Sequence, residues 1–131
     1  MTNPNFISPT KTARGLGSAK SGTSHHIRQR VSAIALFFLV PWFIYAIMTA
    51  SGMDWASARE WAAKPHNALL LMLTAGAAFY HMCLGMQVVI EDYIYTPGMK
   101  GFLLILNRFA CIALFAAFAL SVLKLWIGAD A

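Results

Sequence analysis

The sequence predicts an all-α fold in which three transmembrane helices form a membrane-anchor bundle. Of its 131 residues, 59% are hydrophobic and 11% are charged, whereas soluble domains carry about 25% charged residues. The mean hydropathy is +0.61. A chain of this length makes one domain, and it is too apolar to cover a water-facing surface. Most of it is therefore expected to lie in lipid or against partner subunits.

Three apolar segments are each long enough to cross a bilayer, which takes about 20 residues. They lie at about residues 31–51, 67–90 and 102–127. Pro41 lies in the middle of the first segment and is expected to kink that helix, which a packed bundle tolerates. Together the segments make one transmembrane domain, residues 31–131, and they leave residues 1–30 as a basic N-terminal arm.

Several polar and aromatic residues lie where the ends of these helices should meet the membrane surface. Arg108, near the start of the third helix, and Lys124, in its last turn, can extend toward an interface. Trp55, Trp61 and Trp126 suit the aromatic belt at the membrane–water boundary. These positions support the three spans.

The basic residues indicate which end of the chain lies in the cytoplasm. The arm has no acidic residue and carries five cations: Lys11, Arg14, Lys20, Arg28 and Arg30. The first loop has Arg59 and Lys64. This asymmetry places the N-terminus in the cytoplasm and the C-terminus on the opposite side. Topology thus explains the net charge of +5, so membrane lipids, and not nucleic acid, are the expected partners.

The second segment contains a histidine, His81, at a depth where a polar side chain is costly. It precedes Ile90 by nine residues, which places it about 14 Å from the cytoplasmic end of the helix. A polar side chain there should face protein, water or a ligand. At the spacing of three and four, His81 shares a helical face with small residues, which are Thr74, Ala77, Ala78 and Gly85.

This face has two interpretations. In the first, the small residues allow close helix packing, and His81 forms a hydrogen bond across the interface. In the second, a flat cofactor lies along the face and the imidazole binds its iron, as in haem proteins with two axial histidines. His25 and His26 lie at the mouth of the first helix and His66 begins the second, so no other histidine is deep in this chain. The haem interpretation therefore requires a second anchor subunit that supplies the other ligand and completes the bundle.

Asp92 and Tyr93 lie about three turns beyond His81, at the cytoplasmic interface. An interfacial tyrosine is by default a membrane anchor, and Tyr95 is interpreted in this way. Beside a carboxylate, Tyr93 can instead donate a hydrogen bond to a quinone carbonyl, with Asp92 supporting proton delivery. Arg30, at the start of the first span, suits either contact with lipid headgroups or neutralisation of haem propionates.

Two stretches of the sequence resemble the small hydrophobic membrane anchor of bacterial succinate dehydrogenase (respiratory complex II). The first is HMCLGMQVVIEDY, residues 81–93, and the second is GLGSAKSGTSHHIRQRVSAIAL, residues 15–36. The resemblance extends to the three-helix layout and to most of the chain from residue 15 onward. The spacing from the histidine to the Asp-Tyr pair is its most specific part.

The resemblance implies a role for each matching residue. His81 would be an axial ligand of haem b, with the other ligand from the larger cytochrome b anchor, and Arg30 would lie near the haem propionates. Tyr93 would hydrogen-bond the substrate ubiquinone, beside Asp92. The chain would not be catalytic alone. It would join a flavoprotein and an iron–sulfur subunit in electron transfer of the respiratory chain and the tricarboxylic acid cycle. Its expected location is the bacterial inner membrane, with the C-terminus in the periplasm.

Two alternative functions fit the same sequence. The anchor of a fumarate reductase-type quinol oxidase would look similar, because the direction of the reaction depends on redox potentials and on the soluble subunits. A cofactor-free three-span transporter or assembly protein would use His81 for proton relay or for packing. Two features argue against this second alternative. The chain has no inverted repeat, and apart from His81 and Arg108 it has no deeply placed ionisable group.

Overall fold

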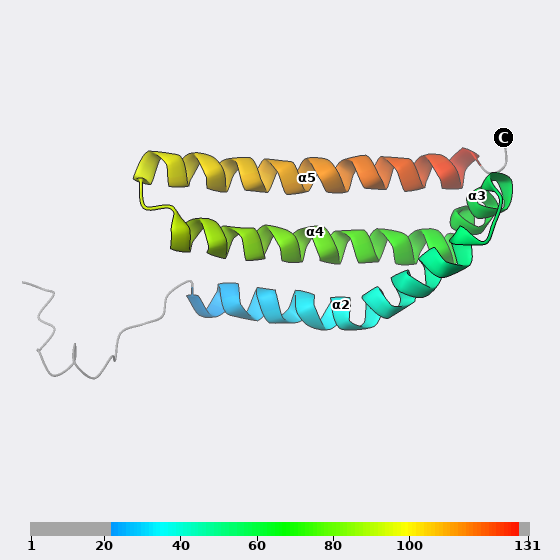
Figure 1. Cartoon of the computed structure of the whole chain (residues 1–131), viewed down its shortest axis with the longest axis horizontal. Coiled ribbons are helices and arrows are strands. Elements are labelled where there is room, and N and C mark those ends of the chain that lie inside the picture. The colour runs from blue at the N-terminus through cyan, green and yellow to red at the C-terminus, as the bar shows by residue number, and fades with distance from the viewer. Residues whose placement is uncertain (1–21, 129–131) are drawn as a thin grey trace, which may run out of the picture.

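The computed structural model describes residues 22–128 of the chain. Its four helices are α2 (Gly22–Ser51), α3 (Trp55–Ala63), α4 (Pro65–Tyr93) and α5 (Pro97–Ile127). Helices α2, α4 and α5 lie side by side in one layer with α4 in the middle, and the short α3 lies at one end of that layer (Figure 1). The predicted all-α fold with three long apolar helices is confirmed.

The three long helices have the dimensions of membrane spans. The segments Thr23–Ser51, Pro65–Tyr93 and Pro97–Ile127 contain 29, 29 and 31 residues, and each is apolar enough to cross a membrane. Each measures about 43–47 Å at the usual helical rise, whereas the hydrocarbon core of a bilayer is about 30 Å thick. The helix ends therefore extend into the polar boundary on both sides.

All three long helices begin earlier than the apolar segments do. The first begins at Gly22 instead of near residue 31, so Arg28 and Arg30 are helical. Helices α4 and α5 begin at Pro65 and Pro97, and proline is favourable in a first turn because its missing N–H has no helical partner there. Residues 1–21, which make up most of the predicted N-terminal arm, lie outside the described residues.

The connection between the first two spans contains α3, where the sequence predicts a loop. Asp54 caps this helix, because its carboxylate accepts a hydrogen bond from the backbone N–H of Ala56 at 3.2 Å. Hydrogen bonding to the Ser57 side chain holds the pKa of the exposed Asp54 carboxyl below its ordinary value of 3.8. The charged carboxylate therefore suits the cap, which satisfies an N–H that the helix leaves free.

Helix α3 is tied to the C-terminal end of α5. Arg59 of α3 donates a hydrogen bond to the carbonyl of Gly128, just after α5 ends. Trp55 of α3 and Trp126 of α5 are exposed. Lys124 lies in the last turn of α5, as predicted. Aromatic and cationic side chains thus mark this end of the molecule, as they do at a membrane interface.

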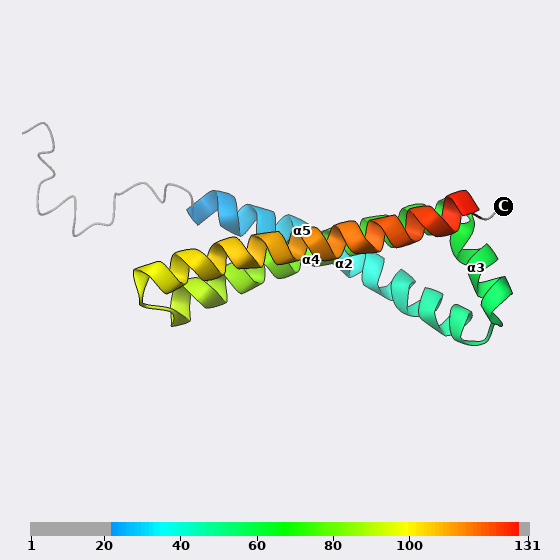
Figure 2. The ribbon, with the colours of Figure 1, turned by 90° about the horizontal axis from the view of Figure 1, so that it is seen from above.

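The long helices do not lie parallel to one another. Helix α2 crosses α4 and α5 at an angle in Figure 2, and its second half bends toward α3 in Figure 1. Pro41 lies inside α2, and a proline removes one helical hydrogen bond and clashes with the preceding turn. The bend agrees with the kink that Pro41 predicts.

The interior of this layer is small. The buried apolar residues are mostly of small or medium size: Ala46, Ala63, Ala68, Ala75, Leu84, Ile90, Cys111 and Val122. In the described part of the chain, no large side chain is fully buried, and many large apolar side chains are exposed. Such a surface suits lipid tails or the helices of other membrane subunits.

A polar contact joins α4 and α5 inside their spans. Asn107 of α5 donates a hydrogen bond from Nδ2 to the backbone carbonyl of Cys83 at 3.0 Å. The Cys111 thiol, one turn further along α5, donates to Asn107 Oδ1 at 3.7 Å. Hydrogen bonds between membrane helices contribute about 0.6 kcal/mol each on average, and up to about 1.7 kcal/mol.

The change Asn107→Leu is expected to destabilise the detergent-solubilised protein by about 1 kcal/mol, because it removes the contact from Asn107 to Cys83. The measurement is the thermal unfolding midpoint followed by circular dichroism. Ser121→Ala is the matched control on the same helix, because the Ser121 hydroxyl donates within α5, to the carbonyl of Ala117. Equal midpoints for Asn107→Leu and Ser121→Ala would contradict the stabilising role of Asn107.

Candidate functional site

His81 lies on the side of α4 that packs against α2, and α2 provides two polar neighbours for it. Ser32 Oγ lies 2.9 Å from His81 Nδ1, and Gln29 Nε2 lies 3.4 Å from His81 Nε2. Ser32 is buried and His81 is half-buried. A Cβ atom added to Gly85, one turn beyond His81, would lie 3.7 Å from Gln29 Nε2, so the two helices approach closely here.

The small-residue face predicted around His81 is partly covered by the protein itself. Thr74 is buried, Ala77 is half-buried and Ala78 is exposed. The packing interpretation thus describes the geometry of this chain taken alone, because the imidazole is hydrogen-bonded across a helix interface. The exposed part of the face leaves room for a further group or subunit beside His81.

The two polar neighbours of His81 are compatible with a tautomer that has the imidazole hydrogen on Nδ1. Ser32 Oγ donates its one hydrogen to the backbone carbonyl of Gln29 at 3.0 Å, so toward His81 it acts as an acceptor of the Nδ1–H. The side-chain amide nitrogen of Gln29 can only donate, so it requires a lone pair on His81 Nε2. In this arrangement the imidazole hydrogen lies on Nδ1, whereas turning the Ser32 hydroxyl and the Gln29 amide round would place it on Nε2.

This tautomer fits a haem ligand. Iron binds neutral imidazole through a nitrogen lone pair, and a ligating histidine usually donates its other N–H to a neighbouring acceptor. Ser32 Oγ, at 2.9 Å from Nδ1, is placed to be such an acceptor. The contact of Gln29 with Nε2 is long, and Gln29 Oε1 is buried without a hydrogen-bond partner among the described residues. Moving the Gln29 amide away from Nε2 would therefore break one weak contact.

The residues of the described segment do not form a site for a metal ion held by several side chains. Within residues 22–128, no three His, Cys, Asp or Glu side chains gather in a way that could hold one. A haem iron does not need such a cluster, because the porphyrin supplies its equatorial ligands and the protein supplies one or two axial ones. His81 is thus suited to contribute one ligand of a shared site.

Asp92 and Tyr93 lie in the last turn of α4, which ends at Tyr93. The Tyr93 side chain is 75% exposed, and Asp92 is also exposed. Twelve residues separate Tyr93 from His81, which corresponds to about 18 Å along the helix. One helix therefore carries both predicted sites, at different depths and without contact between them.

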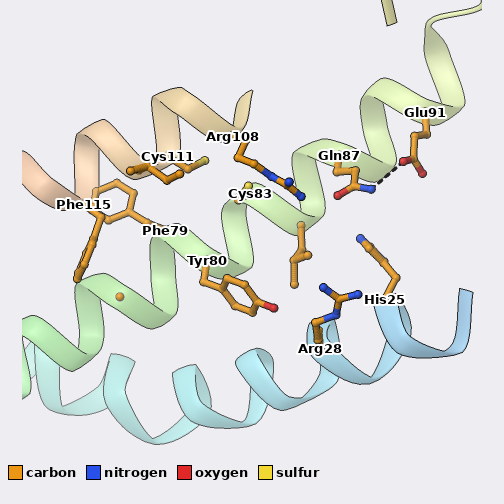
Figure 3. Close-up of a pocket in the computed structure, with 13 residues that line it drawn as sticks. His25, Arg28, Phe79, Tyr80, Cys83, Gln87, Glu91, Arg108, Cys111 and Phe115 are labelled. Carbon is orange, nitrogen blue, oxygen red and sulfur yellow. Dashed lines mark hydrogen bonds between the residues drawn. The ribbon is translucent and has the colours of Figure 1, made fainter. Parts of the chain in front are cut away.

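Arg30, which the sequence predicts as a site residue, has different surroundings from Arg28. Arg30 is exposed on α2. Arg28, two residues earlier, lines a groove of about 770 Å³ that lies over α4 between α2 and α5 (Figure 3). Neither Arg30, His81 nor Tyr93 is among the residues that line this groove. The groove is therefore separate from the sites predicted from the sequence.

Ser32 and Gln29 are the site residues that the sequence does not single out. A signal for them exists, because they are polar, three residues apart and on one face at the start of the first span. Ser32 lies about 15 Å from the first residue of α2, and His81 about 18 Å from the last residue of α4. If α2 and α4 are antiparallel neighbours, Ser32 and His81 lie at nearly the same depth. The sequence alone does not establish that these two helices are neighbours.

Comparison with known proteins gives a consistent result. Residues 4–123 match the model of the family described as "Succinate dehydrogenase/Fumarate reductase transmembrane subunit". The succinate dehydrogenase hydrophobic membrane anchor subunit of Rickettsia conorii is 38% identical over 111 residues, which cover 84% of this chain and 88% of the relative. The subunit of the same name from Paracoccus denitrificans is 32% identical over 124 residues, which cover 95% of each chain. No solved structure shows a significant match.

The family match and the relatives account for the features that the structure displays. Three helices of spanning length, an exposed apolar surface and a small interior are expected of a multi-pass membrane subunit that works within a larger complex. The relatives cover nearly all of the chain, so the likeness extends beyond a single helix. The chain belongs to the succinate dehydrogenase/fumarate reductase transmembrane subunit family, as a membrane anchor of the succinate dehydrogenase type.

Proposed function

We propose that this anchor shares a haem b with a larger cytochrome b anchor subunit and forms part of the site where ubiquinone is reduced. The observation that carries the proposal is the contact of His81 Nδ1 with Ser32 Oγ at 2.9 Å, which leaves Nε2 with only the long contact to Gln29 at 3.4 Å. The flavoprotein and iron–sulfur subunits of the complex would oxidise succinate and deliver the electrons. The names of the relatives favour this direction over fumarate reductase-type quinol oxidation.

A second face of α4 supports the contact with the larger anchor. Met82, Met86, Val89 and Tyr93 share one face at helical spacing, and their side chains are 42%, 47%, 50% and 75% exposed. Flexible methionines and a tyrosine make a surface that adapts to a partner helix. A subunit on this face would approach His81 from the side and would cover Tyr93 at the membrane boundary.

The residues at the end of α4 suit the chemistry of quinone reduction, which consumes two electrons and two protons. The Tyr93 hydroxyl donates a hydrogen bond to a quinone carbonyl oxygen and stabilises the negative charge that develops there as electrons arrive. Asp92 is exposed, so it exchanges protons with water and passes them to the reduced oxygen. A bound haem would supply a centre that accepts and returns single electrons, and Arg30 would pair with its propionates.

The proposed orientation has the start of α2 and the turn between α4 and α5 on the cytoplasmic side of a bacterial inner membrane. These elements lie at the same end of the molecule (Figure 1). The support is the distribution of cations, because Arg28, Arg30 and Lys100 belong to this end and the cytoplasmic boundary attracts basic residues. The C-terminus would then lie in the periplasm.

Replacing the proposed ligand tests its role directly. In the purified complex, His81→Ala is expected to abolish the optical spectrum of a haem b with two histidine ligands, because the iron loses one axial ligand. His66→Ala is the matched control, since His66 is an exposed histidine in the first turn of the same helix. An unchanged spectrum in His81→Ala would assign His81 to helix packing.

The contact of Ser32 with the imidazole gives a separate prediction. Ser32→Ala is expected to raise the haem midpoint potential and to weaken haem retention by about tenfold, because Nδ1–H loses its acceptor and the ligand becomes less basic. Redox titration and haem release into apomyoglobin measure these effects. Ser51→Ala controls for the loss of a hydroxyl from α2, because Ser51 bonds to Met48 within its own helix. Equal potentials in the two variants would refute the contact.

Tyr93 and Tyr95 are both interfacial tyrosines, so one serves as the control for the other. Tyr93→Phe is expected to lower kcat/KM for ubiquinone about tenfold, the effect of losing one hydrogen bond of about 1.4 kcal/mol. Tyr95→Phe is expected to leave it unchanged, since Tyr95, at 85% exposure, is interpreted as a membrane anchor. The measurement is succinate–quinone reductase activity of the complex. Similar values for both variants would remove the role proposed for Tyr93.

A further inference from the structure

The groove over α4 is a separate feature of the molecule that the proposed haem and quinone sites do not use. Its volume of about 770 Å³ falls in the range of about 300–1,000 Å³ that is usual for ligand pockets. Tyr80 and Ile112, which line it, are 45% and 59% exposed, so the groove opens to the surface. Helix α2 forms one wall, α5 the other, and α4 the floor (Figure 3).

One end of the groove is cationic. Arg28 and His25 from α2 and Arg108 from α5 line it and point toward the space between the helices (Figure 3). Arg28 is oriented by Ser24, whose hydroxyl and backbone carbonyl accept its hydrogen bonds at 2.9 Å and 3.2 Å. His25 Nε2 is buried and has no hydrogen-bond partner among the described residues. Side chains from two helices thus present unsatisfied or positively charged groups to one volume.

The negative charge at this end is small. Glu91 is the one carboxylate that lines the groove, and its Oε1 already accepts a hydrogen bond from Gln87 at 2.8 Å. Two arginines against one glutamate leave an excess of positive charge. This end therefore complements an anion, and arginine binds the oxygens of a phosphate through paired N–H groups.

The other end of the groove is apolar. Phe79 of α4 and Ile112 and Phe115 of α5 line it. Gly76 also lines this end, and a Cβ atom added to it would lie 3.5 Å from the Phe115 ring. From Glu91 to Gly76 the helix rises about 22 Å. The groove is thus long, charged near the membrane boundary and apolar toward the membrane interior.

The groove lies on a third face of α4. Gly76, Tyr80, Cys83, Gln87 and Glu91 form this face at helical spacing. The face that contains His81 and Gly85 packs against α2, and the second face, with Met82, Met86 and Tyr93, is exposed. A ligand in the groove would therefore contact neither the proposed haem ligand nor the proposed quinone residues.

We infer that this groove binds one anionic phospholipid, with the headgroup phosphate held by Arg28, Arg108 and His25 and one acyl chain lying along the apolar end. The cationic end of the groove matches the phosphate of such a molecule, and the apolar end, which opens to the membrane, matches its acyl chain. Basic pockets between membrane helices at the cytoplasmic boundary are a recurrent way of binding lipid headgroups. The site is independent of the roles proposed for His81 and Tyr93.

The test is native mass spectrometry of the purified complex titrated with phosphatidylglycerol in a mild detergent. In the double variant Arg28→Gln, Arg108→Gln, the tightest-bound phosphatidylglycerol is expected to bind about 30-fold more weakly. This is the effect of removing two arginines near a membrane surface. Lys124→Gln, which removes a cation at the opposite end of α5, should match the wild type. Equal affinity in the double variant and in Lys124→Gln overturns the proposal.

A second variant blocks the apolar end and keeps both arginines, so it does not depend on how the double variant folds. Ile112→Trp is expected to lower lipid affinity about tenfold, because the indole occupies the volume of the acyl chain. Leu114→Trp, at a 50% exposed position on α5 outside the groove lining, is the matched control. Lipid affinity that is equal in these two variants contradicts the inference.

A photoreactive residue at position 112 identifies the occupant. Illumination of the complex in vesicles that contain phosphatidylglycerol is expected to give an adduct with the mass of this lipid on the anchor chain. An adduct to another protein subunit, or to a quinone, shows a different occupant and overturns the proposal. Because the readout is a mass, it does not require a bound haem or quinone reductase activity.

Discussion

Inside a bilayer no water is available to satisfy an imidazole, so the contact between His81 and Ser32 constrains how the first two spans can pack. The two side chains are 2.9 Å apart, and a buried polar group without a partner in hydrocarbon is costly. Sliding or rotating α2 by one residue would separate them. This one contact therefore sets the relative depth of α2 and α4, and with it the places of Arg28 and Arg30.

Helix α4 organises the rest of the molecule because it lies between the other two spans. It has three chemically different faces: one against α2 around His81, one over the groove, and one exposed face that ends at Tyr93. Few residues of the layer are buried. A chain of this kind gains little from its own core and depends on neighbouring subunits and lipids to cover its apolar surface, which agrees with its place in a multi-subunit family.

The three spans are predictable from the sequence because hydropathy and length are local properties, and the depth of His81 follows from counting residues. The start of α2 at Gly22 does not follow from hydropathy, because polar residues continue the helix beyond the apolar run. Helix α3 does not follow from hydropathy either, although Asp54 before an alanine-rich segment is a capping signal. The partners of His81 and the groove depend on how helices are rotated against each other, which a single apolar sequence does not specify.

We propose that His81 offers Nε2 to a haem while Ser32 stays beside Nδ1. A cryo-electron microscopy map of the whole complex in lipid nanodiscs, at a resolution that shows side chains, tests it most directly. We expect haem density joined to His81 Nε2, Ser32 Oγ still beside Nδ1, and the Gln29 amide turned away. A map in which His81 keeps both α2 neighbours and no haem density adjoins Nε2 would contradict it.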